Sequence, residues 1–122
     1  MPMRGLTILV ATADAERLHA ALTYAAAGAA SGAPVRLHLH EGAVGLLQPP
    51  LIAPADATRT KAGLPTLEQI LDEALSLGVA ITVCQSGLAL AAIGLDQLDA
   101  RIEAQGPVAM LAALGDDRLM TF

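Results

Sequence analysis

Cys84 is the residue whose type and position most clearly suggest chemistry, and it is the only cysteine in this chain of 122 residues. It ends the apolar run 79–84, which has the length and composition of a strand that is buried on both faces. In an open parallel sheet, ligands collect beyond the carboxyl ends of the strands. The pattern therefore predicts that Cys84 is a reactive thiol at a strand-to-helix turn.

Backbone N–H groups at the start of the following helix are expected to surround the sulfur. They belong to Gln85, Ser86, Gly87 and Leu88. Such unpaired donors favour the thiolate over the thiol, as at other reactive cysteines near helix N-termini. The corresponding chemistry is nucleophilic attack on a sulfur atom, or acceptance of a sulfur atom as a persulfide. A lone free cysteine can instead be a small buried hydrophobic side chain, and the sequence leaves both interpretations open.

His38 and His40 form a second candidate group. They are two positions apart in a predicted strand and therefore face the same side, and Glu41 follows them. Zinc sites usually need three or four converging ligands, so the pair is more simply a polar face near an edge or interface, and we predict no resident metal. Either histidine could assist Cys84 if the fold brings them together. The glycines lack dinucleotide-binding spacing and no phosphate-loop lysine motif is present, so we predict no cofactor.

Strands and helices alternate along the chain with short connections. The predicted strands cover residues 6–11, 35–40, 79–84, 101–104 and 118–122. Asp14 is the expected N-cap of the first helix, and Thr66 with Gln69 forms the expected capping box of the second. A short helix capped by Ser86 comes next, and a last helix opens at Pro107. The alternation predicts one α/β domain over residues 1–122, with three α/β/α layers around a mainly parallel five-stranded sheet.

The stretch from residue 48 to residue 64 fits none of these elements and is rich in proline. A loop of this length inside a compact domain is usually either functional or disordered. With Arg59 and Lys61 it could fold over the site as a lid and supply positive charge. The equally weighted alternative is a flexible surface loop without such a role.

The composition favours a homo-oligomer. Apolar residues make up 54% of the chain and charged residues only 16%, which is little for the surface of a lone monomer. Part of the apolar surface is therefore expected to lie between subunits. The alternative is an alanine-rich composition without special meaning.

Charge and cysteine content narrow the partners and the compartment. The net charge of −5 and the scattered basic residues argue against nucleic acid. No apolar stretch reaches the ~18 residues of a membrane helix, and the first residues read as a strand rather than as a signal peptide. A single cysteine fits a reducing compartment. We therefore expect a cytoplasmic protein without nucleic-acid or membrane partners.

Three segments carry a resemblance to a known family. GVAITVCQSGLALAAIGL (78–95), followed by RIEAQGPVAMLAAL (101–114) and a short final strand, resembles the DsrE/DsrF-like family. GAPVRLHLHEGAVGLL (32–47) is similar too. The resemblance spans nearly the whole chain and is strongest from residue 64 to residue 122. The family includes sulfur-relay subunits and proteins often labelled peroxiredoxin-like.

The resemblance implies a five-stranded α/β/α domain that assembles into trimers or hexamers. In the sulfur-relay members, the cysteine that matches Cys84 carries persulfide sulfur between proteins, and some members lack this cysteine. The leading expectation is thus a sulfur carrier with donor and acceptor proteins as partners, a role that does not require enzymatic turnover by this chain alone. One alternative is a non-enzymatic module of the same fold that binds a small anion or metabolite. A further alternative is a metal-binding subunit that uses His38 and His40.

Overall fold

Five parallel strands form one sheet in the computed structural model, which describes residues 3–122. They are β1 (Leu6–Val10), β2 (Val35–Leu39), β3 (Ala80–Val83), β4 (Glu103–Ala104) and β5 (Arg118–Thr121). Their order across the sheet is β4-β3-β2-β1-β5, and each neighbouring pair is parallel. The predicted α/β class with a parallel five-stranded sheet is confirmed.

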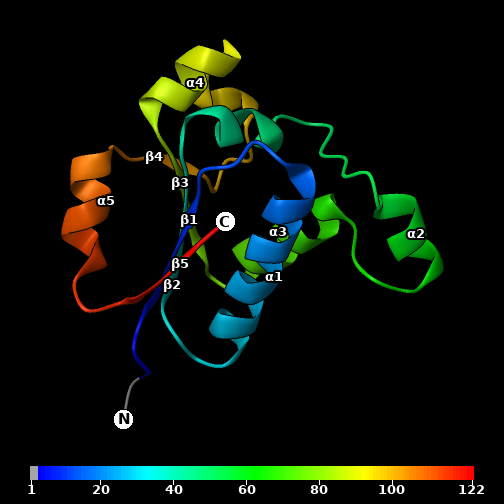
Figure 1. The fold of residues 1–122 in the computed structure, drawn as a ribbon, viewed down its shortest axis with the longest axis horizontal. Coiled ribbons are helices and arrows are strands. Elements are labelled where there is room, and N and C mark those ends of the chain that lie inside the picture. Colours follow the sequence, from blue (N-terminus) through cyan, green and yellow to red (C-terminus); the bar gives the residue numbers. More distant parts are fainter. Residues whose placement is uncertain (1–2) are drawn as a thin grey trace.

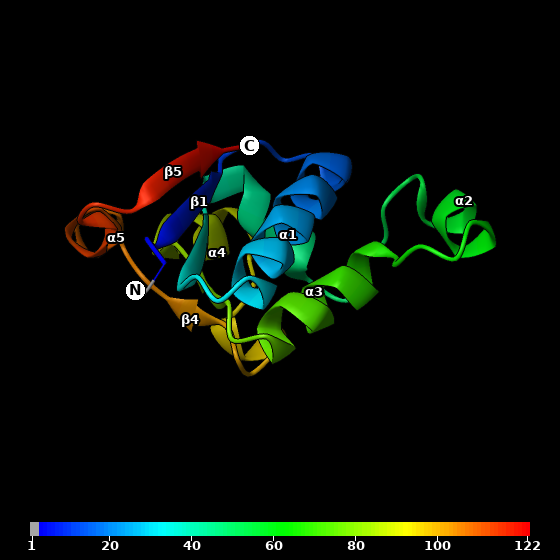
Figure 2. The same ribbon diagram turned by 90° about the horizontal axis from the view of Figure 1, so that it is seen from below.

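Helices lie on both faces of the sheet and at its carboxyl end, as Figures 1 and 2 show. The long helices α1 (Ala15–Ala30) and α3 (Leu67–Ser76) pack together on one face, and α5 (Pro107–Leu114) lies on the other. The short helix α4 (Gln85–Ala91) packs on the 3-10 helix η1 (Glu41–Leu47) beyond the carboxyl ends of the strands. The remaining helices are α2 (Asp56–Lys61) and the 3-10 helix η2 (Leu95–Gln97).

The core lies between the sheet and the α1–α3 layer. Alternate side chains of the strands point into it, because successive residues of a strand face opposite sides. They are Leu6, Ile8, Val10, Val35, Leu37, Leu39, Ile81 and Val83, all of them buried. Leu18 and Leu22 of α1 and Ile70 of α3 are buried in the same core, on the helical side. The apolar faces of α1 and α3 thus cover this side of the sheet.

The opposite face of the sheet is more polar and only partly covered. Thr7 and His38 are its buried polar side chains, and the carboxylate of Asp117 accepts hydrogen bonds from the Thr7 hydroxyl (2.7 Å) and from Arg36 (3.0 Å). Helix α5 is apolar throughout, but only Met110 of its residues is buried. A helix that is apolar on all sides is normally buried, whereas most residues of α5 are exposed here.

The predicted caps of α1 and α3 are confirmed. The Asp14 side chain accepts hydrogen bonds from two backbone N–H groups at the start of α1, and Thr66 and Gln69 form both bonds of the capping box of α3. Strand β4 is shorter than the predicted 101–104. The reason is a turn at Asp99, which takes the N–H groups of Arg101 and Ile102 (2.9 and 3.0 Å) and so keeps them from pairing with β3.

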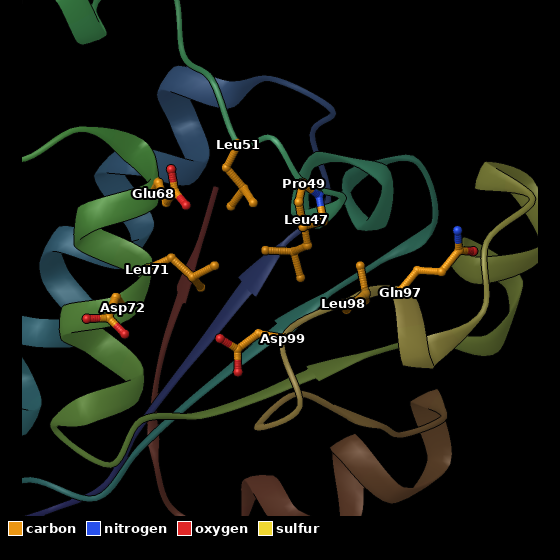
Figure 3. Close-up of a pocket in the computed structure, with 9 residues that line it drawn as sticks. All are labelled: Leu47, Pro49, Leu51, Glu68, Leu71, Asp72, Gln97, Leu98 and Asp99. Atoms are coloured by element: carbon orange, nitrogen blue, oxygen red, sulfur yellow. The ribbon is translucent and has the colours of Figure 1, made fainter.

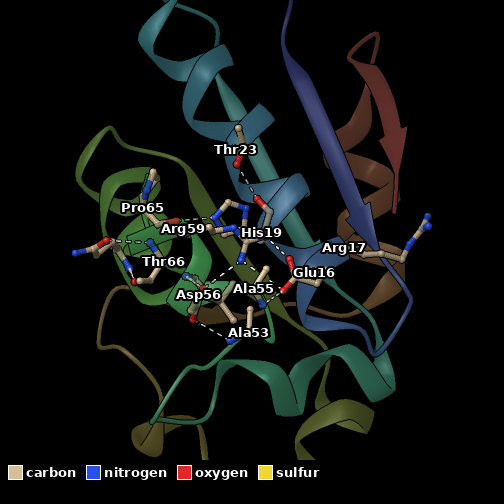
Figure 4. Close-up of polar contacts among 12 residues, drawn as sticks. Glu16, Arg17, His19, Thr23, Ala53, Ala55, Asp56, Arg59, Pro65 and Thr66 are labelled. Atoms are coloured by element: carbon tan, nitrogen blue, oxygen red, sulfur yellow. Dashed lines mark hydrogen bonds and ion pairs between the residues drawn. The ribbon is translucent and has the colours of Figure 1, made fainter. Parts of the chain in front are cut away.

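The prediction of an irregular loop from residue 48 to residue 64 is wrong in part, because residues 56–61 form α2. The Asp56 carboxylate accepts hydrogen bonds from the N–H groups of Ala53 (2.9 Å) and Leu67 (3.0 Å), which ties together the residues on either side of α2. Arg59 pairs with Asp56 and with Glu16 of α1, as Figure 4 shows. Glu16 and Leu67 lie outside the segment, so its local sequence did not reveal these two contacts.

We predict that Asp56→Ala releases this segment. Burial opposes ionisation of Asp56, but the two N–H groups and Arg59 outweigh it and hold the pKa of this carboxyl below its usual range. The group therefore stabilises the fold above the ordinary aspartate pKa, and this contribution is lost as pH falls through the lowered value. At neutral pH we expect the variant to lose about 1–3 kcal/mol of stability and to be cut by trypsin several-fold faster after Arg59 or Lys61.

The matched control is Glu73→Ala, which removes an exposed carboxylate from α3. It should leave the trypsin rate and the unfolding free energy near those of the unsubstituted protein. Equal cleavage of the Asp56→Ala variant and this control would contradict the assignment.

Candidate functional site

Cys84 lies where β3 gives way to α4, as predicted, and it is itself the N-cap of that helix. The expectation that Ser86 caps the helix is wrong. The Cys84 backbone is extended (φ −81°, ψ 151°), and its sulfur accepts the hydrogen bond from the Gly87 N–H at 3.2 Å. The thiol therefore takes the place that a serine or aspartate oxygen usually has at a helix start.

Three donors converge on the sulfur of Cys84. The N–H group of Glu41 lies 3.0 Å from Sγ, the N–H group of Gly87 lies 3.2 Å away, and the Ser86 hydroxyl lies 3.3 Å away. Two of the four predicted residues thus contact the sulfur, Ser86 through its side chain rather than its backbone. The N–H group of Leu88 instead donates to the Cys84 carbonyl oxygen (3.3 Å), as in any first helical turn. Gln85 is not among the donors to sulfur in residues 3–122.

Glu41 is the donor that sequence reasoning missed. The β2–β3 register places Leu39 beside Val83, so the residues that follow these two strands meet at the same edge. Glu41 also has a φ of 42°, in the left-handed region that residues other than glycine rarely adopt. Its N–H group points to Sγ in this conformation. A strand register is a long-range property, and no local pattern in the sequence indicated it.

Close packing of α4 on η1 covers the thiol. The side chain of Cys84 is 1% exposed. A Cβ atom added at Gly87 would overlap the Val44 side chain and lie 2.8 Å from the Glu41 carbonyl oxygen, so only glycine allows this approach. Ser86 is exposed, and its hydroxyl contacts the sulfur. The sulfur therefore lies one side chain below the surface.

Burial and hydrogen bonding act in opposite directions on the Cys84 thiol. Burial opposes ionisation, while the donors from Ser86, Glu41 and Gly87 stabilise the anion, and together they lower the pKa of Cys84 below its ordinary value. The net effect favours the thiolate, which is the nucleophilic form of cysteine.

The two histidines of β2 and its end lie near this site without bonding to the sulfur. His38 is buried, and its Nδ1 is 2.8 Å from the Thr82 hydroxyl. His40 Nε2 is 3.4 Å from a carboxylate oxygen of Glu41. Within residues 3–122 neither histidine bonds to Sγ, and no group of three or more His, Cys, Asp or Glu side chains is placed to hold a metal ion.

The proposed lid does not form in this structure. Helix α2 projects beyond α1 and α3, on the side of the molecule away from α5, rather than over α4 (Figures 1 and 2). The Arg59 guanidinium is held by Glu16 and Asp56, and Lys61 ends the same helix. Arg59 and Lys61 are therefore not brought to Cys84.

A separate hollow of about 330 Å³ lies between α3 and the segment around η2, as Figure 3 shows. Its carboxylates include Asp72 and Asp99, and both pair with Arg101 at 2.9 Å. Hydrogen bonds from Arg101 lower the pKa of Asp99 to about 2. Arg101 thus pairs with two of the three carboxylates that line this hollow, and Glu68 is the third.

The fold matches solved structures of other small proteins. The YchN protein of E. coli superposes with a TM-score of 0.76 at 21% sequence identity, covering 98% of this chain and 100% of the other. MTH1491 of Methanobacterium thermoautotrophicum, a protein of unknown function, gives a TM-score of 0.72 at 10% identity, with coverages of 98% and 100%. BT1422 of Bacteroides thetaiotaomicron, a conserved protein of unknown function, gives 0.67 at 17%, with coverages of 98% and 95%. At these identities the likeness shows a shared fold.

No protein-family model and no curated protein sequence matches the chain. Across residues 3–122, no helix is both long and apolar enough to cross a membrane. The chain is therefore a small α/β protein with the fold of YchN. Its function has to be inferred from the residues around Cys84 rather than from these structures.

We predict that the rate of alkylation of Cys84 rises with pH around a midpoint below that of a free cysteine peptide. Ser86→Ala removes one donor to the anion, so its midpoint should rise by about one pH unit. The measurement is the iodoacetamide rate against pH, followed by intact mass. Ser31→Ala is the control, because that hydroxyl bonds to the Ala27 carbonyl oxygen within α1 and not to the sulfur. Identical midpoints for the two variants would contradict the role of Ser86.

We predict that Gly87→Ala forces α4 away from η1 and destabilises the protein by about 1–3 kcal/mol, because the added methyl group has no space. Gly45→Ala is the matched control, since a Cβ there would lie 3.6 Å from the Ala91 Cβ, an ordinary contact in the same interface. Urea unfolding measures both. A Gly87→Ala variant as stable as the Gly45→Ala variant would show that the close approach is not needed.

Proposed function

We propose that the chain is a cytoplasmic sulfur carrier of the DsrE/DsrF-like type, in which Cys84 receives and passes on a sulfane sulfur atom. The observation that carries the proposal is the set of three hydrogen-bond donors on the Cys84 sulfur. Their arrangement stabilises a sulfur anion at the carboxyl end of a parallel sheet. The fold shared with YchN is consistent with the family that the sequence resembles.

The transfer step is a thiolate exchange at sulfur. The Cys84 thiolate attacks the outer sulfur of a donor persulfide, R–S–SH, and the S–S bond of the donor breaks. The products are the Cys84 persulfide, Cys–S–SH, and the donor thiolate, R–S⁻, so no external oxidant or reductant is needed. Attack of an acceptor thiolate on the outer sulfur reverses the step. The chain needs no turnover of its own for this role.

Access to the thiol requires movement within α4 rather than of the 48–64 segment. Helix α4 has seven residues, and only Gly87 and Leu88 of them are buried. It ends at Ala92 in the left-handed conformation, with a φ of 55°. Helix α4 packs closely on η1, so opening of the whole helix would break that packing, whereas the Ser86 side chain is exposed. Rotation of the Ser86 side chain would expose the sulfur beneath it.

The direct test is treatment of the folded protein with glutathione persulfide, followed by intact mass. We expect the protein to gain one sulfur atom at Cys84, and a Cys84→Ser variant to gain none. The same chain unfolded in urea provides the control thiol. A folded protein that gains no sulfur under conditions where the unfolded chain does would exclude the carrier role.

A binding module of the same fold is the alternative, and the 1% exposure of Cys84 is the observation that favours it. In that case Cys84 is a buried, hydrogen-bonded cap of α4, and the ligand binds elsewhere at the carboxyl edge of the sheet. The Cys84→Ser variant separates the two functions, because it abolishes sulfur transfer but keeps a hydrogen-bonding N-cap and any ligand binding.

We propose in addition that the α5 face is covered by other copies of this chain, in a homo-oligomer such as a trimer or hexamer. Val108 and Leu111 of α5 are 84% and 63% exposed, and Leu119 of the neighbouring edge strand is 50% exposed. Apolar side chains gathered on one face are more typical of a subunit interface than of a monomer surface.

The expected result is an oligomer in light scattering coupled to gel filtration, shifted toward monomer by Val108→Glu. Leu64→Glu is the control, because Leu64 is similarly apolar and 56% exposed but precedes α3 on the other side of the sheet. A monomeric unsubstituted protein at micromolar concentration would exclude the assembly.

A further inference from the structure

A second cavity lies at the carboxyl ends of β1 and β2, on the α5 face of the sheet. It has a volume of about 240 Å³. Leu9 of β1 and Met110 and Leu111 of α5 are among its apolar walls, and its polar side chains are His38 and His40. Ligands of open parallel sheets bind beyond the carboxyl ends of the strands, so the position is a favourable one.

His38 supplies an unpaired nitrogen to this cavity. The residue is 4% exposed, and its Nδ1 is bonded to Thr82, whereas Nε2 has no hydrogen-bond partner among residues 3–122. In the same part of the chain, every fully buried side-chain nitrogen or oxygen has a partner. Nε2 is therefore not sealed, and the cavity is the space that His38 lines. An almost fully buried side chain thus presents one open polar atom there.

The hydrogen-bond network decides whether that atom donates or accepts. The Thr82 hydroxyl donates to Oε1 of the Gln105 side-chain amide at 3.3 Å, so the hydroxyl lone pair is left to accept the proton of His38 Nδ1–H at 2.8 Å. A neutral imidazole has one donor nitrogen and one acceptor nitrogen. With Nδ1 protonated, Nε2 carries the lone pair and accepts. Burial and the nearby His40 lower the pKa of His38, which keeps the ring neutral at pH 7.

The other groups around the cavity select against charge on a ligand. Its walls are apolar, and the Glu41 carboxylate is turned to His40 Nε2. No Lys, Arg, Asp or Glu side chain of the described residues lines it. A carboxylate or phosphate placed there would lose its hydration without gaining a cation, which costs several kcal/mol. The lone pair of Nε2 would also repel an anion.

We propose that this cavity binds a small, neutral molecule with an apolar body and one hydroxyl or N–H group, which donates a hydrogen bond to His38 Nε2. A phenol, an indole or a short alcohol has this chemistry. The volume is slightly below the range of drug-sized pockets, which fits a ligand with a single ring. The inference is independent of Cys84, because none of the donors to its sulfur lines the cavity.

The test uses phenol and toluene, which share a ring shape and differ in the hydroxyl donor. Binding is measured by calorimetry on the protein in its native assembly, and the His38 ring nitrogens are followed by ¹⁵N NMR. We expect phenol to bind about fivefold more tightly than toluene, and to shift the Nε2 resonance while Nδ1 keeps its proton. Benzoate is expected not to bind.

Two variants locate the binding site, and one serves as control. Ala11→Leu and Leu111→Phe fill the cavity from its rim, and each should reduce phenol affinity at least tenfold. His19→Gln alters a histidine whose Nε2 contacts the Pro65 carbonyl oxygen (2.9 Å), and it should leave binding unchanged. The Cys84→Ser variant should also bind phenol normally, so failure here and failure of sulfur transfer are separate results.

Absence of phenol binding, equal affinity for phenol and toluene, or an Nε2-protonated His38 in the free protein would each overturn the proposal. Phenol binding that appears only in a monomeric variant would also overturn it, because a second copy of the chain would then fill the cavity in the native assembly.

Discussion

The hydrogen bonds to the Cys84 sulfur are the interaction around which the carboxyl end of the sheet is built. They require β2 and β3 to be in the register that brings Glu41 beside Cys84. They also require α4 to approach η1 closely enough for the Gly87 N–H to reach the sulfur, which only a glycine permits. The left-handed backbone of Glu41 is part of the same arrangement. The left-handed backbone of Glu41, the glycine at position 87 and the β2–β3 register are thus all part of the hydrogen bonding to the Cys84 sulfur.

Burial gives this arrangement two possible consequences. A hydrogen-bonded sulfur that is only 1% exposed can be a stable helix cap or a protected nucleophile. The lowered pKa of Cys84 favours the protected nucleophile, because a structural cysteine in apolar surroundings has a raised pKa. The Ser86 side chain above the thiol supplies a route of access, because it is exposed and its rotation does not break the packing of α4 on η1. The α2 segment has no such role, because its arginine is held by Glu16 and Asp56.

Features set by neighbouring residues could be predicted from the sequence, and features set by distant residues could not. Asp14 and the Thr66–Gln69 pair marked helix starts because a cap and its partners lie within one turn. The parallel sheet followed from apolar runs that alternate with helices. The hydrogen bond from Glu41 to Cys84 could not be predicted, because it depends on which strands are neighbours in the sheet. Helix α2 was not predicted because Asp56 and Arg59 are held by Leu67 and Glu16, which lie outside the 48–64 segment.

The two candidate sites lie at the ends of adjacent strands and differ in chemistry. Cys84 is surrounded by donors and favours an anion, whereas the cavity at His38 presents an acceptor and favours a neutral donor. Stabilisation of the Cys84 thiolate is tested most directly by the ¹³Cβ chemical shift of Cys84 in the folded protein as pH is varied. We predict a titration midpoint below that of a cysteine peptide measured under the same conditions, and a midpoint at or above the peptide value would contradict this stabilisation.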